Sequence, residues 1–294
     1  MSERPSSPFV SQLELPIGRD RRPDRNAHKG GRSFYFFDFD DNIMRLNTCI
    51  SIYNDRTGEE QVLSTKHFAR VHRQLGKPGP YQDFCIHPDD QTGSYRRFRD
   101  LPATELQGRE QPFVEDLRAA LEQGDLVWKG PSWEFFFHAV FNERPLALVT
   151  ARGHHPDTMK AGIKVLSEAG FLAGEPNYLG IYTVSHPGVR AELGDPEKQR
   201  SIPELKREAI LRSVATAMQR YGENPYHRFG MSDDDPANVA LAVTAMQELK
   251  VRHPKNAFFV INTHGEPPIT TEIFAHSTNS APMPHVEQLR LFGG

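Results

Sequence analysis

The hydrophobic positions of the chain fall into short apolar runs, most of them separated by segments with helical spacing. The runs that resemble buried strands cover residues 33–37, 146–150, 178–184, 228–231 and 257–261. Unbroken apolar runs of this length are typical of strands buried on both faces of a parallel sheet. Ser201 and Glu204 form a capping box at the start of a helix that extends to about Tyr221, and residues 236–249 predict another helix. This alternation predicts an α/β fold with a doubly wound, mostly parallel sheet.

The same pattern divides the chain into a core, an insertion and two polar ends. Residues 1–31 are rich in Pro, Arg, Ser and Gly and predict a flexible arm. The core is expected over 32–46 and 132–274. Between its first two strands, residues 47–131 predict an insertion that begins with a hairpin and a helix, and residues 275–294 predict a flexible tail.

Composition narrows the class of protein. No stretch approaches the roughly 20 apolar residues that span a bilayer, and the first residues lack the apolar run of a secretory signal, so a cytoplasmic protein without a membrane partner is expected. Cys49 and Cys85 have no CxxC spacing, so the sequence supports neither a disulfide framework nor a structural zinc site. The net charge of -3 decides nothing about polyanionic partners.

Acidic residues directly follow the first strand. Asp38 and Asp40 stand two positions apart at its end, where two carboxylates can face one cavity. Phosphoryl transfer through a covalent intermediate uses such a pair, one as the nucleophile and the other as general acid and base. An isolated pair of this kind is more often a solvated acidic turn. The residues at the other strand ends must therefore decide between a catalytic pair and such a turn.

Two further candidates suit the binding of a phosphoryl group. Thr150 ends the second strand, where its hydroxyl can donate to a phosphoryl oxygen, although it could equally be a helix cap or turn residue. Lys206, near the start of the capped helix, can neutralise charge on a nucleophile and a phosphoryl group, with Lys198 and Arg207 as competitors.

The fourth strand ends in the acidic run Asp233-Asp234-Asp235, followed by Asn238. Clustered carboxylates need a compensating cation, and oxygen ligands suit magnesium, Mg²⁺. Asp235 precedes Pro236 and is expected to cap the next helix, which leaves Asp233 and Asp234 for the metal.

Taken together, these motifs resemble those of the haloacid dehalogenase (HAD) superfamily of phosphohydrolases, with its Rossmann-like core. The resemblance implies that Asp38 is the nucleophile and Asp40 the general acid and base, with Thr150 and Lys206 holding the phosphoryl group. It also implies Mg²⁺ coordination by Asp38, the backbone carbonyl of Asp40 and Asp233, supported by Asp234. Asp41-Asn42 departs from the more common Gly-Thr of that family, and the insertion takes the position of a substrate-selecting cap.

Residues near these motifs are candidates for contacts with substrate. Arg152, Gly153 and His154 follow Thr150, and Asn42 can offer a donor. Within the insertion, the run 95–99 (YRRFR) interleaves cations with aromatic rings, which suits a phosphorylated or nucleic-acid ligand, although ordinary surface salt bridges are the more common use of such a run.

The last residues carry a separate signal. Gln288, Leu289, Leu291 and Phe292 resemble the QLxLF motif by which bacterial proteins dock on the replicative sliding clamp. Such a tail can present its apolar side chains to a groove on a partner, although a segment that packs on its own domain is the alternative.

The sequence therefore predicts an Mg²⁺-dependent phosphomonoester hydrolase with an aspartyl-phosphate intermediate. The sequence does not identify its phosphorylated substrate, and DNA ends and nucleotides are among the candidates. Two alternatives stay open. One is a catalytically degenerate adaptor in DNA maintenance that docks on the clamp, and the other is a phosphotransferase with an alcohol as acceptor.

Overall fold

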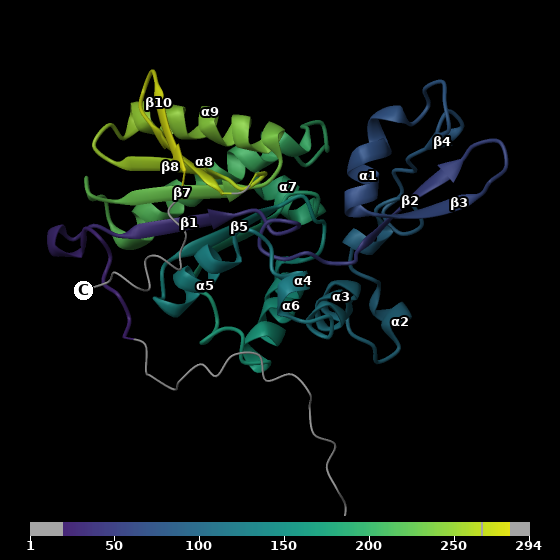
Figure 1. Cartoon of the computed structure of the whole chain (residues 1–294), viewed down its shortest axis with the longest axis horizontal. Coiled ribbons are helices and arrows are strands. Elements are labelled where there is room, and N and C mark those ends of the chain that lie inside the picture. Colours follow the sequence, from purple (N-terminus) through teal and green to yellow (C-terminus); the bar gives the residue numbers. More distant parts are fainter. Residues whose placement is uncertain (1–19, 266, 283–294) are drawn as a thin grey trace, which may run out of the picture.

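A computed structural model of the chain describes residues 20–265 and 267–282. Its main feature is a seven-stranded sheet in the order β10-β9-β8-β7-β1-β5-β6 (Figure 1). The strands are, in chain order, β1 Ser33–Phe37, β5 Leu146–Thr150, β6 Tyr178–Thr183, β7 Arg228–Asp233, β8 Ala257–Asn262, β9 Ile269–Ile273 and β10 Thr278–Pro282.

All five strands predicted from the apolar runs are confirmed, and they pair in parallel. Core clusters lie on both faces of the sheet that these strands form, which is why their sequences are almost continuously hydrophobic. β9 and β10 were not predicted. They extend the sheet in the antiparallel sense beyond β8, and their sequences (ITTEI and TNSAP) lack a continuous apolar run.

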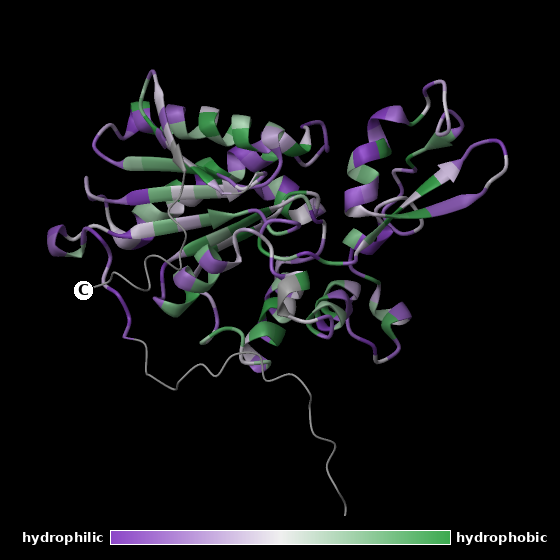
Figure 2. Cartoon of the chain, viewed as in Figure 1, coloured by the Kyte–Doolittle hydropathy of each residue, from purple (hydrophilic) through white to green (hydrophobic). Residues whose placement is uncertain are grey.

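Helices cover both faces of the sheet. One face packs against α8 Ile202–Tyr221 and α9 Pro236–Arg252, and the other against α3 Pro112–Leu121, α5 Trp133–Phe141 and α6 Pro156–Glu168. Figure 2 shows the middles of the central strands as predominantly hydrophobic. Side chains alternate between the two faces, so Phe36 lies in one core cluster and Phe37 in the other.

The remaining helices are short. They are η1 Ala27–Lys29, α1 Thr65–Val71, η2 His72–Gln74, η3 Arg96–Phe98, α2 Ala103–Leu106, α4 Asp125–Trp128 and α7 Pro187–Glu192. Within the part of the chain that is described, no helix combines the length and the apolarity needed to cross a lipid bilayer.

The insertion contains a second, three-stranded sheet in the order β3-β2-β4, formed by β2 Cys49–Asn54, β3 Glu60–Ser64 and β4 Phe84–Cys85. The predicted hairpin and the helix after it are confirmed. Figure 1 shows this small sheet beside the edge at which β1 and its parallel neighbours end. Its own hydrophobic cluster has three buried members, Ile52, Leu63 and Val71.

Three predicted boundaries need correction. The second half of the predicted insertion belongs to the core, because α3 packs into the same hydrophobic cluster as α6. Within the predicted arm, Asp24 is packed against the core, since it forms a buried ion pair of 2.8 Å with Arg144. Within the predicted tail, residues 278–282 are ordered, because they form β10.

Candidate active site

The strand order brings the predicted motifs together. β1 lies between β5 and β7, so Asp38, Thr150 and Asp233, which stand at the ends of these three parallel strands, share one edge of the sheet. The backbone N–H of Asp38 donates to the Ser232 carbonyl at 2.9 Å, which extends the pairing to the nucleophile candidate. Ligand sites of open α/β sheets lie at this edge.

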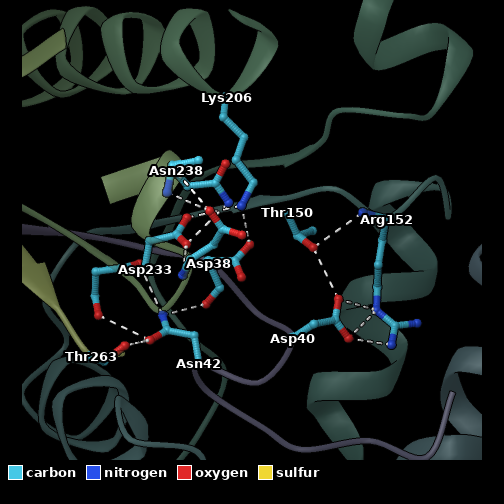
Figure 3. Close-up of polar contacts among 12 residues, drawn as sticks. Asp38, Asp40, Asn42, Thr150, Arg152, Lys206, Asp233, Asn238 and Thr263 are labelled. Carbon is cyan, nitrogen blue, oxygen red and sulfur yellow. Dashed lines mark hydrogen bonds and ion pairs between the residues drawn. The ribbon is translucent and has the colours of Figure 1, made fainter. Parts of the chain in front are cut away.

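Lys206 links two of these strands (Figure 3). Its Nζ donates to Asp38 Oδ1 at 2.8 Å and to Asp233 Oδ2 at 3.0 Å, and all three side chains are buried. The capping box at Ser201 fixes the start of α8, and Leu205 anchors its first turns in the core. Lys206 is thereby placed over the strand ends, as predicted.

The two competing cations lie elsewhere. Lys198 is half exposed and pairs with Asp90, and Arg207 pairs with Glu248 on α9. The structure therefore selects Lys206 from the three candidates.

The cluster carries more negative than positive charge. Burial raises the pKa of Asp38, and the carboxylates of Asp233 and Asp234 add to this effect against the attraction of Lys206. Burial acts to lower the pKa of Lys206, but Asp38 and Asp233 outweigh it and raise that pKa, so the ammonium stays charged. Burial, followed by the charges of Asp233 and Asp41, raises the pKa of Asp234 to about 7.

This donor set fits a hard divalent cation. Carboxylate oxygens of Asp38, Asp233 and Asp234 all lie within 4.8 Å of one another. Two oxygen ligands of one Mg²⁺ are about 3 to 4 Å apart, so small side-chain shifts suffice. A divalent ion would offset the excess of carboxylates over the single ammonium group. The side chain of Asp40 faces Arg152 instead, which leaves only its backbone carbonyl for the metal role that was predicted.

Asp233 is held by the start of the next helix. Its Oδ1 accepts the backbone N–H of Asp235 at 3.0 Å and the Asn238 side-chain amide at 3.3 Å. Asp235 caps α9 by accepting from Ala237 and Asn238, which confirms its predicted role.

The turn after Asp38 contains Asp41 and Asn42, the two positions that depart from the Gly-Thr of the resembled motif. Asp41 has φ 56°, a left-handed conformation that glycine adopts freely and aspartate tolerates. Asn42 is fully buried, and its amide donates to the carbonyls of Asp38 and Ser232, both at 3.1 Å. Its Oδ1 accepts from Ser132 at 2.8 Å and Thr263 at 2.7 Å. The prediction that Asn42 binds substrate is therefore wrong in this structure, because its polar atoms hold four separate segments together.

We expect Asn42→Ala to lower the free energy of unfolding by about 2–4 kcal/mol, because it leaves two hydroxyls and two carbonyls buried without this partner. Denaturant-induced unfolding measures the change. Asn47→Ala is the control, because Asn47 is exposed and should cost less than about 0.5 kcal/mol. Equal losses in the two variants would contradict the bracing role of Asn42.

Asp40 forms a bidentate ion pair with Arg152. The Nε of Arg152 lies 3.0 and 2.9 Å from the two carboxylate oxygens, and Nη2 lies 2.6 Å from Oδ1 (Figure 3). The guanidinium is fully buried, 4.8 Å from the ring centroids of both Phe98 and Phe113. Thr150 Oγ1 donates to Asp40 Oδ2 at 3.4 Å. Arg152 was predicted to touch substrate, but the structure directs it at Asp40.

Gly153 and His154 are likewise turned inward. The N–H of Gly153 donates to the Phe98 carbonyl at 2.9 Å, and a Cβ at this position would meet the Arg99 guanidinium at 1.9 Å, so glycine allows the insertion to approach. His154 is fully buried against Phe113, and burial followed by the charge of Arg152 lowers its pKa well below the usual value. Their burial therefore gives no support to the predicted substrate contacts of these two residues, which stay predictions.

The arginines of the run 95–99 form ion pairs with carboxylates of the chain itself. Arg96 pairs with Glu60 at 2.5 Å, Arg97 with Asp116 at 3.5 Å and Arg99 with Asp90 at 2.8 Å. Salt bridges thus account for this run, as the sequence alternative expected, and it supplies no argument for nucleic acid.

Sequence reasoning missed the pairing of Arg152 with Asp40 and the bracing of Asn42 by Ser132, Ser232 and Thr263. The only sequence signal for these contacts was the departure from Gly-Thr at Asp41-Asn42.

The tail motif of Gln288, Leu289, Leu291 and Phe292 lies outside the described residues, so clamp docking stays a prediction. Comparisons with family models, with curated proteins and with solved structures found no match to this chain.

Proposed function

We propose that the chain is an Mg²⁺-dependent phosphomonoester hydrolase of the HAD type that works through a phosphorylated Asp38. The observation that carries this proposal is the buried ammonium of Lys206 between Asp38 and Asp233, with Asp234 alongside. A carboxylate held by a lysine beside a hard-cation site is equipped to attack phosphorus, because charge on the phosphoryl oxygens meets two positive centres.

In the first half of the reaction, an Asp38 oxygen attacks phosphorus and the bond from phosphorus to the ester oxygen breaks. The leaving oxygen takes a proton from the Asp40 carboxylic acid, so the products are an Asp38 phosphate and a free alcohol. Lys206 stays bonded to the other Asp38 oxygen and offsets negative charge on the phosphoryl oxygens. The Thr150 hydroxyl, now 3.4 Å from Asp40, would turn to a phosphoryl oxygen.

In the second half, Asp40 as carboxylate takes a proton from water while the water oxygen attacks phosphorus. The bond between phosphorus and Asp38 then breaks, which releases phosphate and restores both carboxyl groups. Asp40 suits this double role because its side chain is 23% exposed, whereas that of Asp38 is 9% exposed. Arg152 positions it.

The metal would be held by Asp38, Asp233 and Asp234, with the Asp40 carbonyl as the fourth protein ligand that the family resemblance implies. When bound, Mg²⁺ would supply positive charge to the phosphoryl oxygens. The small sheet of the insertion is proposed to act as the cap. Support comes from its position beside the strand ends and from the contact between Arg99 and Gly153 next to Thr150.

The proposal is tested by phosphate release in Mg²⁺ and in EDTA. The substrates are an aryl phosphate, nucleoside monophosphates, and DNA oligonucleotides with a 3′- or 5′-phosphate. Release that depends on Mg²⁺ is expected, and added alcohol acceptors separate hydrolysis from phosphotransfer. A well-folded protein that releases no phosphate from any of these substrates would favour the adaptor alternative.

Arg152→Lys is expected to lower kcat on a nucleoside monophosphate about 100-fold, because a single ammonium group cannot hold Asp40 through two contacts. The loss on a nitrophenyl phosphate should be much smaller, because that leaving group needs little protonation. Comparing kcat on the two substrates measures the effect. A purely structural role for Arg152 would reduce both rates equally.

Truncation after Glu287 is expected to leave hydrolysis unchanged and to abolish binding to a bacterial sliding clamp, because it removes Gln288, Leu289, Leu291 and Phe292. Binding is measured by titrating the purified clamp against both proteins. Equal clamp binding by the truncated and full-length chains would remove the docking hypothesis.

A further inference from the structure

A second group of potential metal ligands lies in the small sheet, apart from the proposed catalytic site. Cys85 ends β4, His87 follows two residues later, and Asp55 follows the neighbouring strand β2. β2 and β4 run antiparallel with Tyr53 opposite Cys85, and the N–H of Asp55 donates to the Asp83 carbonyl at 2.9 Å. This pairing brings Asp55 close to Cys85 and His87, which lie 30 and 32 positions later in the sequence.

The three ligand atoms converge. Cys85 Sγ lies 2.9 Å from Asp55 Oδ1, His87 Nε2 lies 3.8 Å from the same oxygen, and all three atoms are within 4.8 Å of one another. From this convergence we propose that Asp55, Cys85 and His87 form a binding site for a zinc-class divalent cation.

The chemistry of these donors separates this site from the oxygen-only cluster at Asp38. One sulfur, one imidazole nitrogen and one carboxylate oxygen favour a borderline cation such as Zn²⁺ over Mg²⁺. Bond lengths of about 2.0–2.3 Å in a tetrahedral site put neighbouring donors about 3.3–3.8 Å apart, so the observed 2.9 and 3.8 Å need only small adjustments. Asp55 is exposed, so the fourth position is open to water or another ligand.

The surroundings hold the imidazole in place. Tyr53 stacks on the His87 ring with centroids 4.2 Å apart and planes 3° from parallel. The backbone of His87 is fixed by Ser94, whose hydroxyl accepts its N–H at 2.9 Å and whose N–H donates to its carbonyl at 2.9 Å. A ring oriented in advance loses less freedom when it coordinates a metal ion.

The small sheet also has little hydrophobic burial of its own, so a metal ion that links its strands would stabilise it. Its hydrophobic cluster contains three buried side chains, and β4 is two residues long. Units with so little apolar burial commonly use metal ions or disulfides for stability. A metal at Asp55, Cys85 and His87 would join the ends of β2 and β4 and stabilise the unit proposed as the cap.

The test is a titration of the full chain with Co²⁺, a spectroscopic substitute for Zn²⁺, in excess Mg²⁺ that occupies the oxygen-only cluster. The proposal predicts one thiolate-to-cobalt charge-transfer band per chain, which Zn²⁺ abolishes by competition. The chain has only two cysteines, so Cys49→Ser is a matched control. It should keep the band, whereas Cys85→Ser should lose it.

His87→Gln leaves the thiol in place and should weaken Zn²⁺ binding at least about tenfold, measured by competition with a chelator. Zn²⁺ should also raise Tm in wild type and in Cys49→Ser more than in Cys85→Ser. The proposal is overturned if no charge-transfer band forms, if the band survives Cys85→Ser, or if His87→Gln binds Zn²⁺ as tightly as wild type. These readouts do not depend on phosphate release, so they stand apart from the proposed hydrolase activity.

Discussion

Asp38→Asn is expected to lower Mg²⁺-dependent phosphate release by at least about 10⁴-fold, the scale seen when a covalent nucleophile is removed. An amide oxygen is too weak a nucleophile to attack phosphorus. Asparagine retains the shape of the side chain and an oxygen for the contact with Lys206, which lies 2.8 Å from Asp38 Oδ1. The loss should therefore appear in kcat while the thermal unfolding curve keeps its cooperativity.

Asp41→Asn is the matched control for this prediction. It makes the same chemical change three residues away, at a position with φ 56° that asparagine tolerates. Activity should stay within about threefold of wild type. If Asp38→Asn retained activity, or if both variants lost it equally, Asp38 would not be the nucleophile.

Lys206→Met is expected to lower the free energy of unfolding in EDTA by about 3–5 kcal/mol and to abolish phosphate release. Methionine fills similar space, but it leaves Asp38 and Asp233 buried without the ammonium that bonds to both. Breaking a buried ion pair from one side carries a cost of this size because the remaining charge has no partner. Denaturant unfolding at neutral pH measures the loss.

Two comparisons make this prediction specific. Lys198→Met removes a half-exposed lysine that contacts Asp90 at 3.4 Å, and it should change stability by less than about 1 kcal/mol. Mg²⁺ should recover part of the stability of Lys206→Met, because a divalent ion among Asp38, Asp233 and Asp234 replaces some of the missing positive charge. Equal stability of the two lysine variants in EDTA would show that Lys206 does not balance the acidic cluster.

Much of the fold could be predicted from local pattern. The apolar runs predicted all five parallel strands, and the capping box at Ser201 predicted the start of α8. Strands β9 and β10 could not be predicted in this way, because β9 is mostly half-buried and β10 lies at the edge of the sheet, so neither is under much pressure to be apolar and both pair mainly through their backbones. The arm boundary failed because a single contact, that between Asp24 and Arg144, decides whether this polar segment packs, and the tail boundary failed because the pairing of β10 with β9 was not predicted.

Asp38, Thr150 and Asp233 were predicted to share an edge because parallel strands end on the same side of a sheet, and the strand order confirms this placement. Their chemistry remains proposed. The sequence narrowed the cation to three candidates, and only packing of α8 selected Lys206.

By itself, then, the sequence determined which segments become buried strands and which acidic residues follow them, because these features depend on local polarity and strand direction. Only the tertiary structure decided that Asn42 braces the turn, that Arg152 faces Asp40, and that Asp55, Cys85 and His87 converge. Each of these depends on contacts between segments far apart in the chain, and the spacing of residues in the sequence does not predict such contacts.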